Sequence, residues 1–491
     1  MHATSLIPPQ VPNRIDGQDR PAQDGQTLPN LNPATGAELC TVARSGEADV
    51  RAAVEAAKRA QPAWAALTPV ARGDLLREAA LLMRERSEAF AEIVSLETGK
   101  SRRDARGETG AAVEMGLFVA GEGRRFYGKT TTSAVPHRTA LIVRQPLGVA
   151  GLIIAANTPI ANVAWKAYPA LLCGNTAVMK ASEDTPATAW AAAKVFDEVG
   201  IPPGVFNVVQ GYGIEAGAPL VAHPDVDLVS FTGSCGVGRQ IQTTAGARLA
   251  KVCVELGGKN PLIVCDDANL DRAVTIAGLS AFSNAGQRCA SGSRLIVFDA
   301  VYDQFKARLL EYTRNLTLGQ GDDDDLGPVI NQRQLDNMVS AIDRARAAGA
   351  TVLIGGGRMT DGAHRDGFYM TPTLLEGAAG DAEISRAELF GPIACLYRVA
   401  DFEEAVCLAN DSPFGLTAAI HTANIDRAMT FLGRIKSGVA SINGGTYGSE
   451  PHMPFGGVRQ SGTGWREAGT EALDVYSDWK TIYIHADPDA V

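Results

Sequence analysis

The sequence lacks the cysteine patterns that build structure. Its eight cysteines are scattered, and none belongs to a Cys-x-x-Cys pair or a Cys/His cluster. This usage is typical of a reducing compartment and argues against a disulfide framework and against a zinc site. We therefore predict no metal site.

Long apolar runs are also missing. The longest lies near 149–156, suits a buried strand and is far too short to cross a bilayer. The first ten residues lack a basic region followed by an apolar one, so we predict no signal peptide. The expectation is a cytoplasmic protein without a membrane partner.

Basic residues are fewer than acidic residues. The 45 Lys and Arg residues face 55 Asp and Glu residues, which gives a formal net charge of −10. This balance disfavours nucleic acid as a partner, although it says nothing about a local pocket. With 491 residues, 45% of them hydrophobic, the chain is long enough for two or three domains with large cores.

The first part of the chain carries no chemical motif. Up to about residue 32 it is rich in Pro, Gln, Asp and Asn, which predicts an extended arm. Ser45 is a plausible N-cap for the helical pattern that follows. Apolar residues then recur at helical spacing from Arg72 until Gly99, and again over about 105–126. We expect these helices to serve packing.

Strand and helix patterns alternate from residue 150 onward. Such alternation predicts a parallel sheet covered on both faces, with a dinucleotide site at the carboxyl ends of its strands. The expected strands are 150–156, 176–180, 206–209, 226–231 and 253–256, with helices over 162–173 and from Thr185-Pro186 to Gly200. A second alternating domain begins with a strand at 294–298 and a helix at 302–316, followed by an acidic turn, 322–325, expected to be a solvated loop.

Two short segments carry the candidate chemistry. Segment 254–261 reads Val-Glu-Leu-Gly-Gly-Lys-Asn-Pro and places Glu255 where an apolar strand pattern breaks into glycines. Segment 284–291 places Cys289 in a loop of small residues after the helical stretch 270–283. A thiolate can attack a carbonyl, and a carboxylate can activate the thiol or a water. A buried structural Cys and a solvated Glu are the commoner roles, so spacing alone does not decide.

The amino-acid sequences of both segments resemble the signature sequences of the NAD(P)-dependent aldehyde dehydrogenase superfamily, in the expected order and separation. The resemblance covers nearly the whole chain and implies an α/β fold with a homodimer or homotetramer. It implies a Rossmann-type parallel-sheet cofactor domain, a second α/β catalytic domain and a β-arm for oligomerisation. Their expected limits are 1–126 with 147–257, 258–469, and 127–146 with 470–491. Residues 473–476, within the arm, are expected to be extended.

The same resemblance assigns roles outside the two segments. Asn157 would hold a developing oxyanion together with the N–H of Cys289, although its local sequence also suits an Asx-turn before Pro159. Glu183 would repel a ribose 2′-phosphate, which favours NAD while leaving NADP open. The glycines of segment 231–238 would let the backbone approach a pyrophosphate, although this is not the standard dinucleotide fingerprint. The implied cofactor residues are Lys180, Ser182, Glu183, Gly233, Ser234, Gly238, Leu256, Glu388 and Phe390.

The residues that depart from the common family sequence lie at positions expected to contact the substrate. Thr158 and Asn162 stand where relatives often carry aromatic or apolar residues, and the tunnel loop contains Tyr447, Ser449 and His452. An alkyl chain would lose about 0.8 kcal/mol per unburied methylene in such a polar tunnel. A short polar or anionic semialdehyde is therefore expected. The candidate cationic anchors are Arg288, Lys166 and Arg459, for which an ordinary salt bridge is the commoner role.

The expected reaction is NAD-dependent oxidation of an aldehyde to a carboxylate. Cys289 would form a thiohemiacetal and then a thioester, which a water activated by Glu255 would hydrolyse. A vanillin-like aromatic aldehyde is an alternative substrate, because His-Met-Pro-Phe-Gly-Gly resembles that group. A CoA-acylating semialdehyde dehydrogenase is disfavoured, because such relatives generally lack a Glu at position 255. A non-catalytic structural protein on this fold would be expected to lose Cys289 or Glu255.

Overall fold

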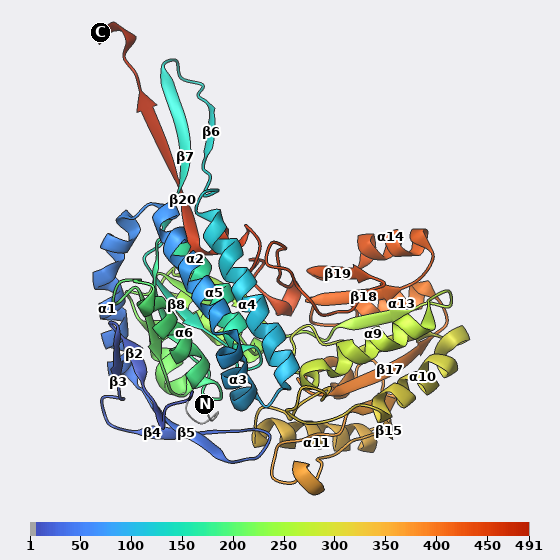
Figure 1. Ribbon diagram of the computed structural model, residues 1–491. Helices are drawn as coiled ribbons and strands as arrows, with labels where there is room; N and C mark the ends of the chain where they lie inside the picture. The colour runs from blue at the N-terminus through green and yellow to red at the C-terminus, as the bar shows by residue number, and fades with distance from the viewer. Residues whose placement is uncertain (1–5, 491) are drawn as a thin grey trace.

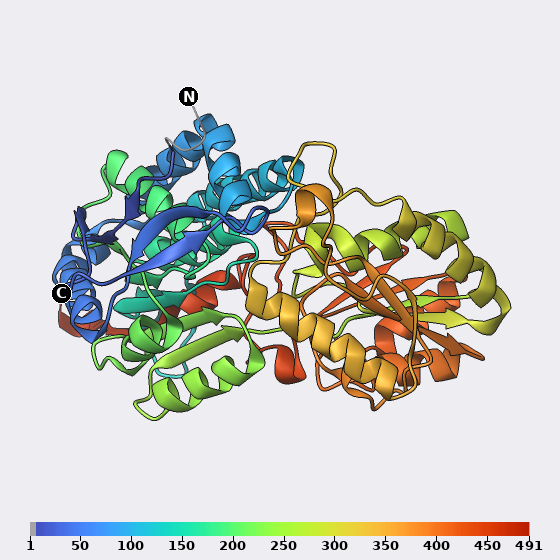
Figure 2. The same cartoon turned by 90° about the horizontal axis from the view of Figure 1, so that it is seen from below.

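Two lobes lie side by side, and a narrow three-stranded arm projects from one of them (Figures 1 and 2). The computed structural model describes residues 6–490. Each lobe is built on a seven-stranded sheet with helices on its faces. This arrangement matches the α/β class expected from the alternating patterns.

The first lobe is built on the sheet β12-β11-β8-β9-β10-β2-β3. Strands β8 to β12 are parallel to one another, whereas the short N-terminal hairpin of β2 and β3 joins antiparallel to β10. Strands β8 and β9 are buried along their whole length, as expected for a sheet covered on both faces. The bounds are β2 Asn13–Ile15, β3 Gln18–Arg20, β8 Val149–Ile153, β9 Thr176–Lys180, β10 Phe206–Val209, β11 Leu228–Thr232 and β12 Lys251–Glu255.

Helices cover both faces of this sheet. They are α1 Glu47–Ala66, α2 Pro69–Glu85, α3 Ser87–Thr98, α4 Arg102–Glu122, α5 Pro159–Leu172, α6 Pro186–Glu198, α7 Ala218–Ala222 and α8 Cys235–Gly246. Two sequence predictions need correction. The N-cap of α1 is Gly46, not Ser45, because the carboxylate of Asp49 accepts the N–H of Gly46 at 3.1 Å. The continuous helix expected up to Gly99 is broken at Arg86 into α2 and α3.

The N-terminal segment is folded onto the first lobe rather than held out as an extended arm. Strands β1 Gln10–Val11, β4 Thr27–Leu31 and β5 Glu38–Ala43 form a small sheet in the order β1-β5-β4. Val11, Leu28 and Val42 of this sheet are buried with Ile93 of α3. This segment is therefore held in place by the packing of alternate apolar residues. Its polar composition gave no indication of this packing.

The second lobe is built on the sheet β15-β16-β17-β14-β13-β18-β19, parallel except for β15. Separate apolar clusters cover its two faces. The strands are β13 Pro261–Val264, β14 Arg294–Phe298, β15 Thr351–Ile354, β16 Thr373–Glu376, β17 Ile393–Val399, β18 Thr417–His421 and β19 Val439–Ile442. The helices are α9 Leu270–Phe282, α10 Asp299–Arg314, α11 Gln332–Ala347, α12 Glu383–Arg386, α13 Phe402–Asn410 and α14 Ile425–Arg434.

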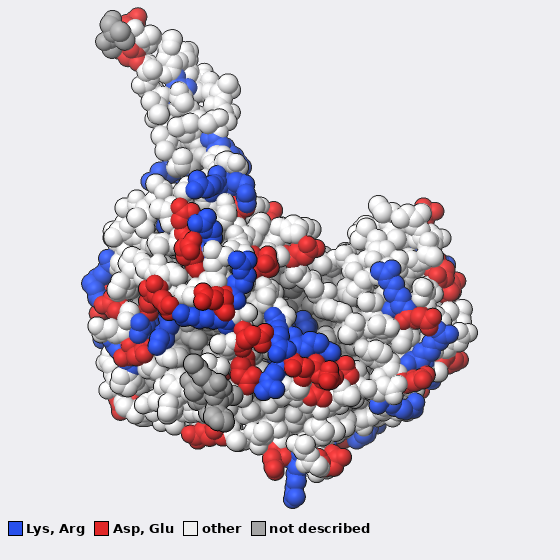
Figure 3. Space-filling model, in the orientation of Figure 1, with Lys and Arg blue, Asp and Glu red and all other residues white. Residues whose placement is uncertain are grey.

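Charged side chains of both signs gather where the lobes meet (Figure 3). The acidic turn expected to be only a solvated loop takes part in this junction. Asp322 pairs with Arg106 of α4, and Asp325 lies 3.7 Å from Arg103. The turn therefore links the second lobe to the start of α4, a pairing between distant segments that local composition does not reveal.

The projecting arm consists of β6 Lys129–Thr132, β7 Arg138–Pro146 and β20 Ser477–His485 (Figure 1). Strand β20 runs antiparallel to β7 along its whole length, from Ser477 opposite Pro146 to His485 opposite Arg138. Residues 473–476 are not extended as expected, because they belong to the short helix α15, Ala472–Tyr476. Leu473, Val475 and Tyr476 are buried in the core of the first lobe. No helix in the part of the chain described has the length and apolarity to cross a membrane.

Candidate active site

The candidate catalytic residues come from loops at the junction of the two lobes. Asn157 follows β8, and Glu255 ends β12 in the first lobe. Cys289 lies in the loop between α9 and β14 of the second lobe. Carboxyl ends of parallel strands and the loops that follow them are the usual location of reacting groups in such folds.

The loop that carries Cys289 reverses direction directly after α9. Asn284, Ala285 and Gly286 all have left-handed backbone angles, with φ of 54°, 52° and 65°. A side chain at Gly286 would place its Cβ 2.1 Å from the carbonyl oxygen of Gly391, so glycine is required there. Three successive left-handed residues are costly and persist where the surrounding structure holds them.

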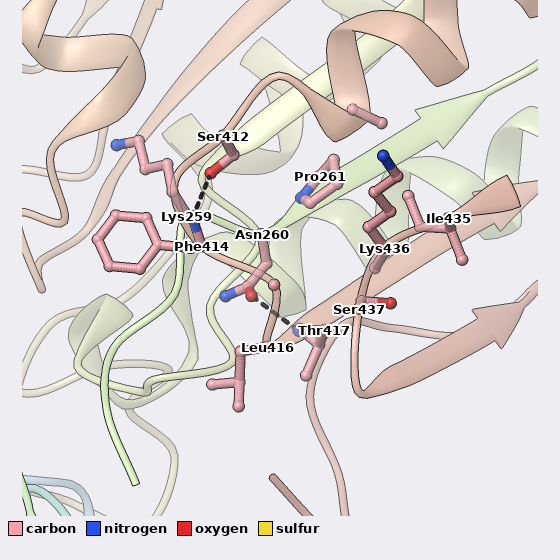
Figure 4. Close-up of a pocket in the computed structure, with 13 residues that line it drawn as sticks. Lys259, Asn260, Pro261, Ser412, Phe414, Leu416, Thr417, Ile435, Lys436 and Ser437 are labelled. Atoms are coloured by element: carbon pink, nitrogen blue, oxygen red, sulfur yellow. Dashed lines mark hydrogen bonds between the residues drawn. The ribbon is translucent and has the colours of Figure 1, made fainter. Parts of the chain in front are cut away.

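Asn260 holds this loop in place. Its Nδ2 donates to the carbonyl oxygens of Cys289 at 2.8 Å and Ser291 at 2.9 Å. Its Oδ1 accepts the backbone N–H of Thr417 at 3.1 Å, beside a small pocket of the second lobe (Figure 4). Asn260 thus connects the two signature segments. Sequence reasoning assigned it no role, although it stands directly after the glycines and the lysine of the first segment.

Asn157 lies against the same loop. Its Nδ2 donates to the carbonyl oxygen of Gln287 at 3.0 Å, two residues before Cys289. A carboxamide has two N–H donors, so one remains for a further acceptor. The predicted oxyanion donor and the predicted nucleophile are therefore brought together by the fold.

The environment of Cys289 does not favour the thiolate. The residue is partly exposed, as are Cys235 and Cys407, whereas the other five cysteines are buried. Loss of water around the thiol, together with the negative charges of Glu388 and Glu255, raises the pKa of Cys289 to about 12. The thiol is therefore protonated at neutral pH, and its attack on a carbonyl requires a proton acceptor.

Glu255 is the candidate for that acceptor. Its carboxylate is buried, and neither oxygen has a hydrogen-bond partner among the described residues. Burial and then the charge of Glu467 raise the pKa of Glu255 well above its usual range, while Lys166 opposes this rise. Gly456 leaves room for the carboxylate, since a Cβ there would lie 2.7 Å from Oε1 of Glu255. An uncommitted carboxylate of raised pKa is suited to general-base chemistry.

Behind Glu255 lies a buried ion pair. Lys166 Nζ is 2.6 Å from Oε1 of Glu467 and donates to Oγ of Ser230 at 2.8 Å. Lys166 is fully buried and therefore cannot be the substrate anchor that the sequence suggested. Glu467 was missed, because it is 301 residues from its partner and lies in no recognisable motif.

The residues predicted to bind the cofactor line the carboxyl ends of the first-lobe strands. Lys180 ends β9, and its Nζ lies 2.8 Å from Oε2 of Glu183, with Ser182 in the same turn. Ser234 is the N-cap of α8 and accepts the N–H of Val237 at 3.5 Å. An exposed helix N-terminus of this kind suits a phosphate group.

A Cβ added at three glycines of this region would force a neighbouring side chain to move. A Cβ at Gly233 would lie 2.4 Å from the ring of Phe231, and one at Gly238 would lie 2.5 Å from Leu256. A Cβ at Gly257 would lie only 1.7 Å from Oε2 of Glu388. The main chain at these glycines therefore packs closely against the neighbouring side chains, which leaves a smooth surface for a dinucleotide.

Glu388 belongs to a turn that faces the nucleophile loop. Its Oε1 accepts the N–H of Gly258 at 3.1 Å, and burial raises the pKa of its carboxyl to about 7. Phe390, two residues on, has a left-handed φ of 57°. Gly258, Arg288, Glu388 and Phe390 line one cleft. Glu388 does not belong to a helix, because α12 ends at Arg386.

Arg288 is the one suggested anchor that the structure leaves uncommitted. Its guanidinium lies 5.8 Å from the centre of the Tyr447 ring, and its Nε is buried without a partner among the described residues. Arg459, by contrast, is exposed and donates to the carbonyls of Asn410 at 2.8 Å and Ser412 at 2.6 Å. Arg459 thus stabilises a loop and is not available as an anchor.

The other predicted substrate residues differ in their surroundings. Nδ2 of Asn162 donates to the carbonyl and hydroxyl oxygens of Thr158, at 2.9 and 3.0 Å, so these two polar groups largely satisfy each other. Ser449 and His452 lie on an exposed loop, where His452 is 3.7 Å from Glu450. No described hydrogen bond links Ser449 or His452 to the groups around Cys289. In the described part of the chain, no group of His, Cys, Asp or Glu could hold a metal ion.

Comparison with known proteins decides the family. The model of the aldehyde dehydrogenase family matches residues 20–482, which is most of the chain. This chain belongs to the aldehyde dehydrogenase family. It is therefore an oxidoreductase, and the resemblance read from the two signature segments is confirmed.

Individual aldehyde dehydrogenases are similar over almost their whole length. The alpha-ketoglutaric semialdehyde dehydrogenase of Bacillus subtilis (strain 168) is 38% identical, over 96% of this chain and 97% of that protein. The alpha-ketoglutarate semialdehyde dehydrogenase of Haloferax volcanii is 37% identical, over 96% and 98%. The crystal structure of betaine aldehyde dehydrogenase from Staphylococcus aureus in complex with NAD+ superposes with a TM-score of 0.96, at 33% identity over 99% of this chain and 97% of that chain.

Proposed function

We propose that this dehydrogenase oxidises a short semialdehyde that carries a carboxylate, and that it uses NAD in preference to NADP. The observation that carries the proposal is that Asn157 donates to the loop of Cys289, whose thiol the charge of Glu255 also reaches. The neighbouring residue, Arg288, lines a cleft with Glu388 and has an uncommitted cation. The two semialdehyde dehydrogenases at 38% and 37% identity support the substrate class. Glu183 supports NAD, because its carboxylate would repel a 2′-phosphate.

The first step joins Cys289 to the aldehyde. Glu255 accepts the thiol proton, directly or through one water, and Sγ attacks the carbonyl carbon to form a thiohemiacetal. The negative charge on the former carbonyl oxygen is held by Nδ2 of Asn157 and by the N–H of Cys289. A fixed pair of donors in a site shielded from water stabilises this oxyanion more than bulk solvent does.

Bound NAD would supply the acceptor for the hydride whose loss converts the thiohemiacetal into a thioester. Lys180 and Glu183 would hold its adenosine ribose, Ser234 its pyrophosphate, and Glu388 its nicotinamide ribose. Glu255 releases the first proton to solvent and then removes a proton from a water, whose oxygen attacks the thioester carbon. The carbon–sulfur bond breaks, the carboxylate leaves, and the proton returns to Sγ of Cys289. The presence of this base opposes a CoA-acylating reaction, in which the thioester must survive.

Cys289→Ala is the direct test of the nucleophile. We expect turnover to fall by more than about 10⁴-fold while NAD binding, measured by fluorescence titration, is unchanged. Cys407→Ala is the matched control, because Cys407 is the exposed thiol of α13 in the second lobe. Substantial turnover by Cys289→Ala would end the proposal. A requirement for CoA in product formation would reassign the reaction.

Arg288→Met tests the substrate class. For a semialdehyde with a terminal carboxylate, we expect KM to rise at least about tenfold, because a charge-assisted hydrogen bond is lost. KM for an uncharged aldehyde of the same length should change little. Arg459→Met is the control, since that guanidinium is bound to carbonyl groups of its own loop. A panel in which vanillin-like aldehydes give the highest kcat/KM would favour the aromatic alternative.

The arm is proposed to join copies of this chain into a homodimer or homotetramer. The support is an exposed β-strand, β20, that projects from the body and leaves one of its edges unpaired. The division into a cofactor domain, a catalytic domain and this arm is likewise a proposal. The burial of Leu473 and Tyr476 in the first lobe places the base of the arm within the core of that lobe.

A further inference from the structure

A buried lysine contacts the backbone of the residue that would stabilise the oxyanion. Lys100 Nζ donates to the carbonyl oxygen of Asn157 at 2.8 Å. The same Nζ lies 2.5 Å from Oε2 of Glu108 on α4. The two charged side chains are only 4% and 5% exposed. A buried charge pair of this kind is costly to desolvate and strongly destabilising to break, so its position next to Asn157 calls for an explanation.

Glu108 fixes the other side of Asn157. Its Oε1 accepts the N–H groups of Ile160 at 3.0 Å and Ala161 at 3.3 Å, in the first turn of α5. The N-cap residue of α5, Thr158, makes no side-chain cap of its own. Glu108 therefore caps α5 from a neighbouring helix, and its negative charge suits the positive end of the helix. The helix so held begins two residues after Asn157.

A third contact ties the same carbonyl to the nucleophile loop. Nδ2 of Asn284 donates to the carbonyl oxygen of Asn157 at 3.3 Å and to that of Gln287 at 3.2 Å. Asn157 thus has its main chain held by Lys100 and Asn284, while its own amide reaches the carbonyl of Gln287. Rotation of this peptide would turn the amide away from the position that an oxyanion occupies.

We propose that Lys100 and Glu108 form a positioning pair that aims Asn157 at the oxyanion. The inference rests on the proposed role of Asn157. Neither member touches the substrate in this scheme; both act through the peptide and helix end on either side of Asn157. Removing one oxyanion donor typically costs about 10²- to 10³-fold in kcat, and a misplacement of about 1 Å costs about 10²-fold. Loss of the pair should fall at the lower end of this range.

The test is a double-mutant cycle with Asn157. Lys100→Met should lower kcat by about 10- to 100-fold while KM and the Kd for NAD change less than about threefold. Added to Asn157→Ala, the same change should cost less than about threefold, because there is no amide left to aim. Equal losses in both backgrounds would overturn the proposal. If Asn157→Ala itself keeps full turnover, the proposed role of Asn157 fails. If Lys100→Met keeps full turnover whereas Asn157→Ala loses it, only the positioning role of Lys100 and Glu108 is refuted.

Glu97→Gln is the matched control. Glu97 caps α6 from the same segment, accepting the N–H groups of Ala187 at 2.6 Å and Thr188 at 2.9 Å, and it has no described contact with Asn157. We expect this variant to lower the Tm and to leave kcat at saturating NAD unchanged. A kcat loss equal to that of Lys100→Met would contradict the proposal, because it would mean that general damage to the segment around residues 97–100 lowers kcat.

Lys100→Met leaves Glu108 unpaired, so a second variant guards against misfolding. The double variant Lys100→Met with Glu108→Gln removes both charges and keeps one carbonyl oxygen for the cap of α5. Its thiol at position 289 should still be alkylated by iodoacetamide at the normal rate, since alkylation forms no oxyanion. Normal alkylation with a kcat lowered about 10- to 100-fold supports positioning. Normal alkylation with normal kcat refutes it.

Discussion

At the scale of single residues, the raised pKa of Glu255 has a cause that can be removed. Burial and the charge of Glu467 raise it, whereas Lys166 lowers it. Glu467→Gln deletes the negative neighbour and leaves the positive one, so the pKa of Glu255 must fall. In the proposed mechanism the carboxylate is the active base, so the acid limb of the pH profile of kcat should move toward lower pH. An unmoved or upward-shifted limb would show that Glu255 does not limit the rate.

In the proposed function, cofactor choice depends on the carboxylate of Glu183. Glu183→Gln removes the charge that would repel a ribose 2′-phosphate and keeps a side chain of similar size beside Lys180. We expect the ratio of kcat/KM for NADP to that for NAD to rise at least about tenfold. Glu198→Gln is the control, because this exposed carboxylate pairs with Arg86 on the far end of α6. An unchanged ratio would mean that another group selects the cofactor.

Residue types and local sequence named the candidate reacting groups but not the residues that support them. Asn157, Glu255 and Cys289 could be named because each stands in a recognisable segment. Lys100 and Glu467 could not, because their partners are 57 and 301 residues away and only the fold brings them together. Asn260 was within reach, since it follows the paired glycines, but its role depends on carbonyls of a distant loop.

At the scale of elements, the paired glycines after β12 lie against Glu388, a residue proposed to hold the cofactor. Gly257→Ala would force Cβ to within 1.7 Å of Glu388 Oε2, so the Glu388 side chain must move. We predict that the Kd for NAD rises at least about tenfold, measured by calorimetry, while iodoacetamide still labels Cys289. Gly246→Ala in α8 is the control, because nothing lies nearer than 3.7 Å to the added carbon. Equal effects of both changes would count against the steric argument.

Buried elements were read more accurately than their ends. The strands at 176–180, 206–209 and 294–298 were predicted with their observed bounds, because each is a short, mainly apolar segment. Residues 473–476 were read as a strand, because Leu-Asp-Val-Tyr alternates apolar and polar residues. They form the short helix α15 because packing into the first lobe decides, and a segment this short carries little periodicity of its own.

At the scale of the whole molecule, the arm presents apolar side chains to solvent. Tyr483 and Ile484 of β20 are 56% and 51% exposed, and charge is sparse over the outer arm (Figure 3). An exposed strand with an unpaired edge is an aggregation hazard unless another chain covers it. This argument favours a second copy of the same arm-bearing chain as the cover, because closed symmetry is the usual solution for soluble oligomers.

The arm can be tested without touching the active site. Tyr483→Asp with Ile484→Asp places two charges on the exposed strand, and burying them in an interface would be strongly unfavourable. Light scattering coupled to size exclusion should then report a smaller particle than the parent protein. Leu31→Asp, on an exposed position at the end of β4, is the control and should leave the mass unchanged. An unaltered mass for the double variant would mean that the copies associate through another surface, and the arm would need a different partner to cover it.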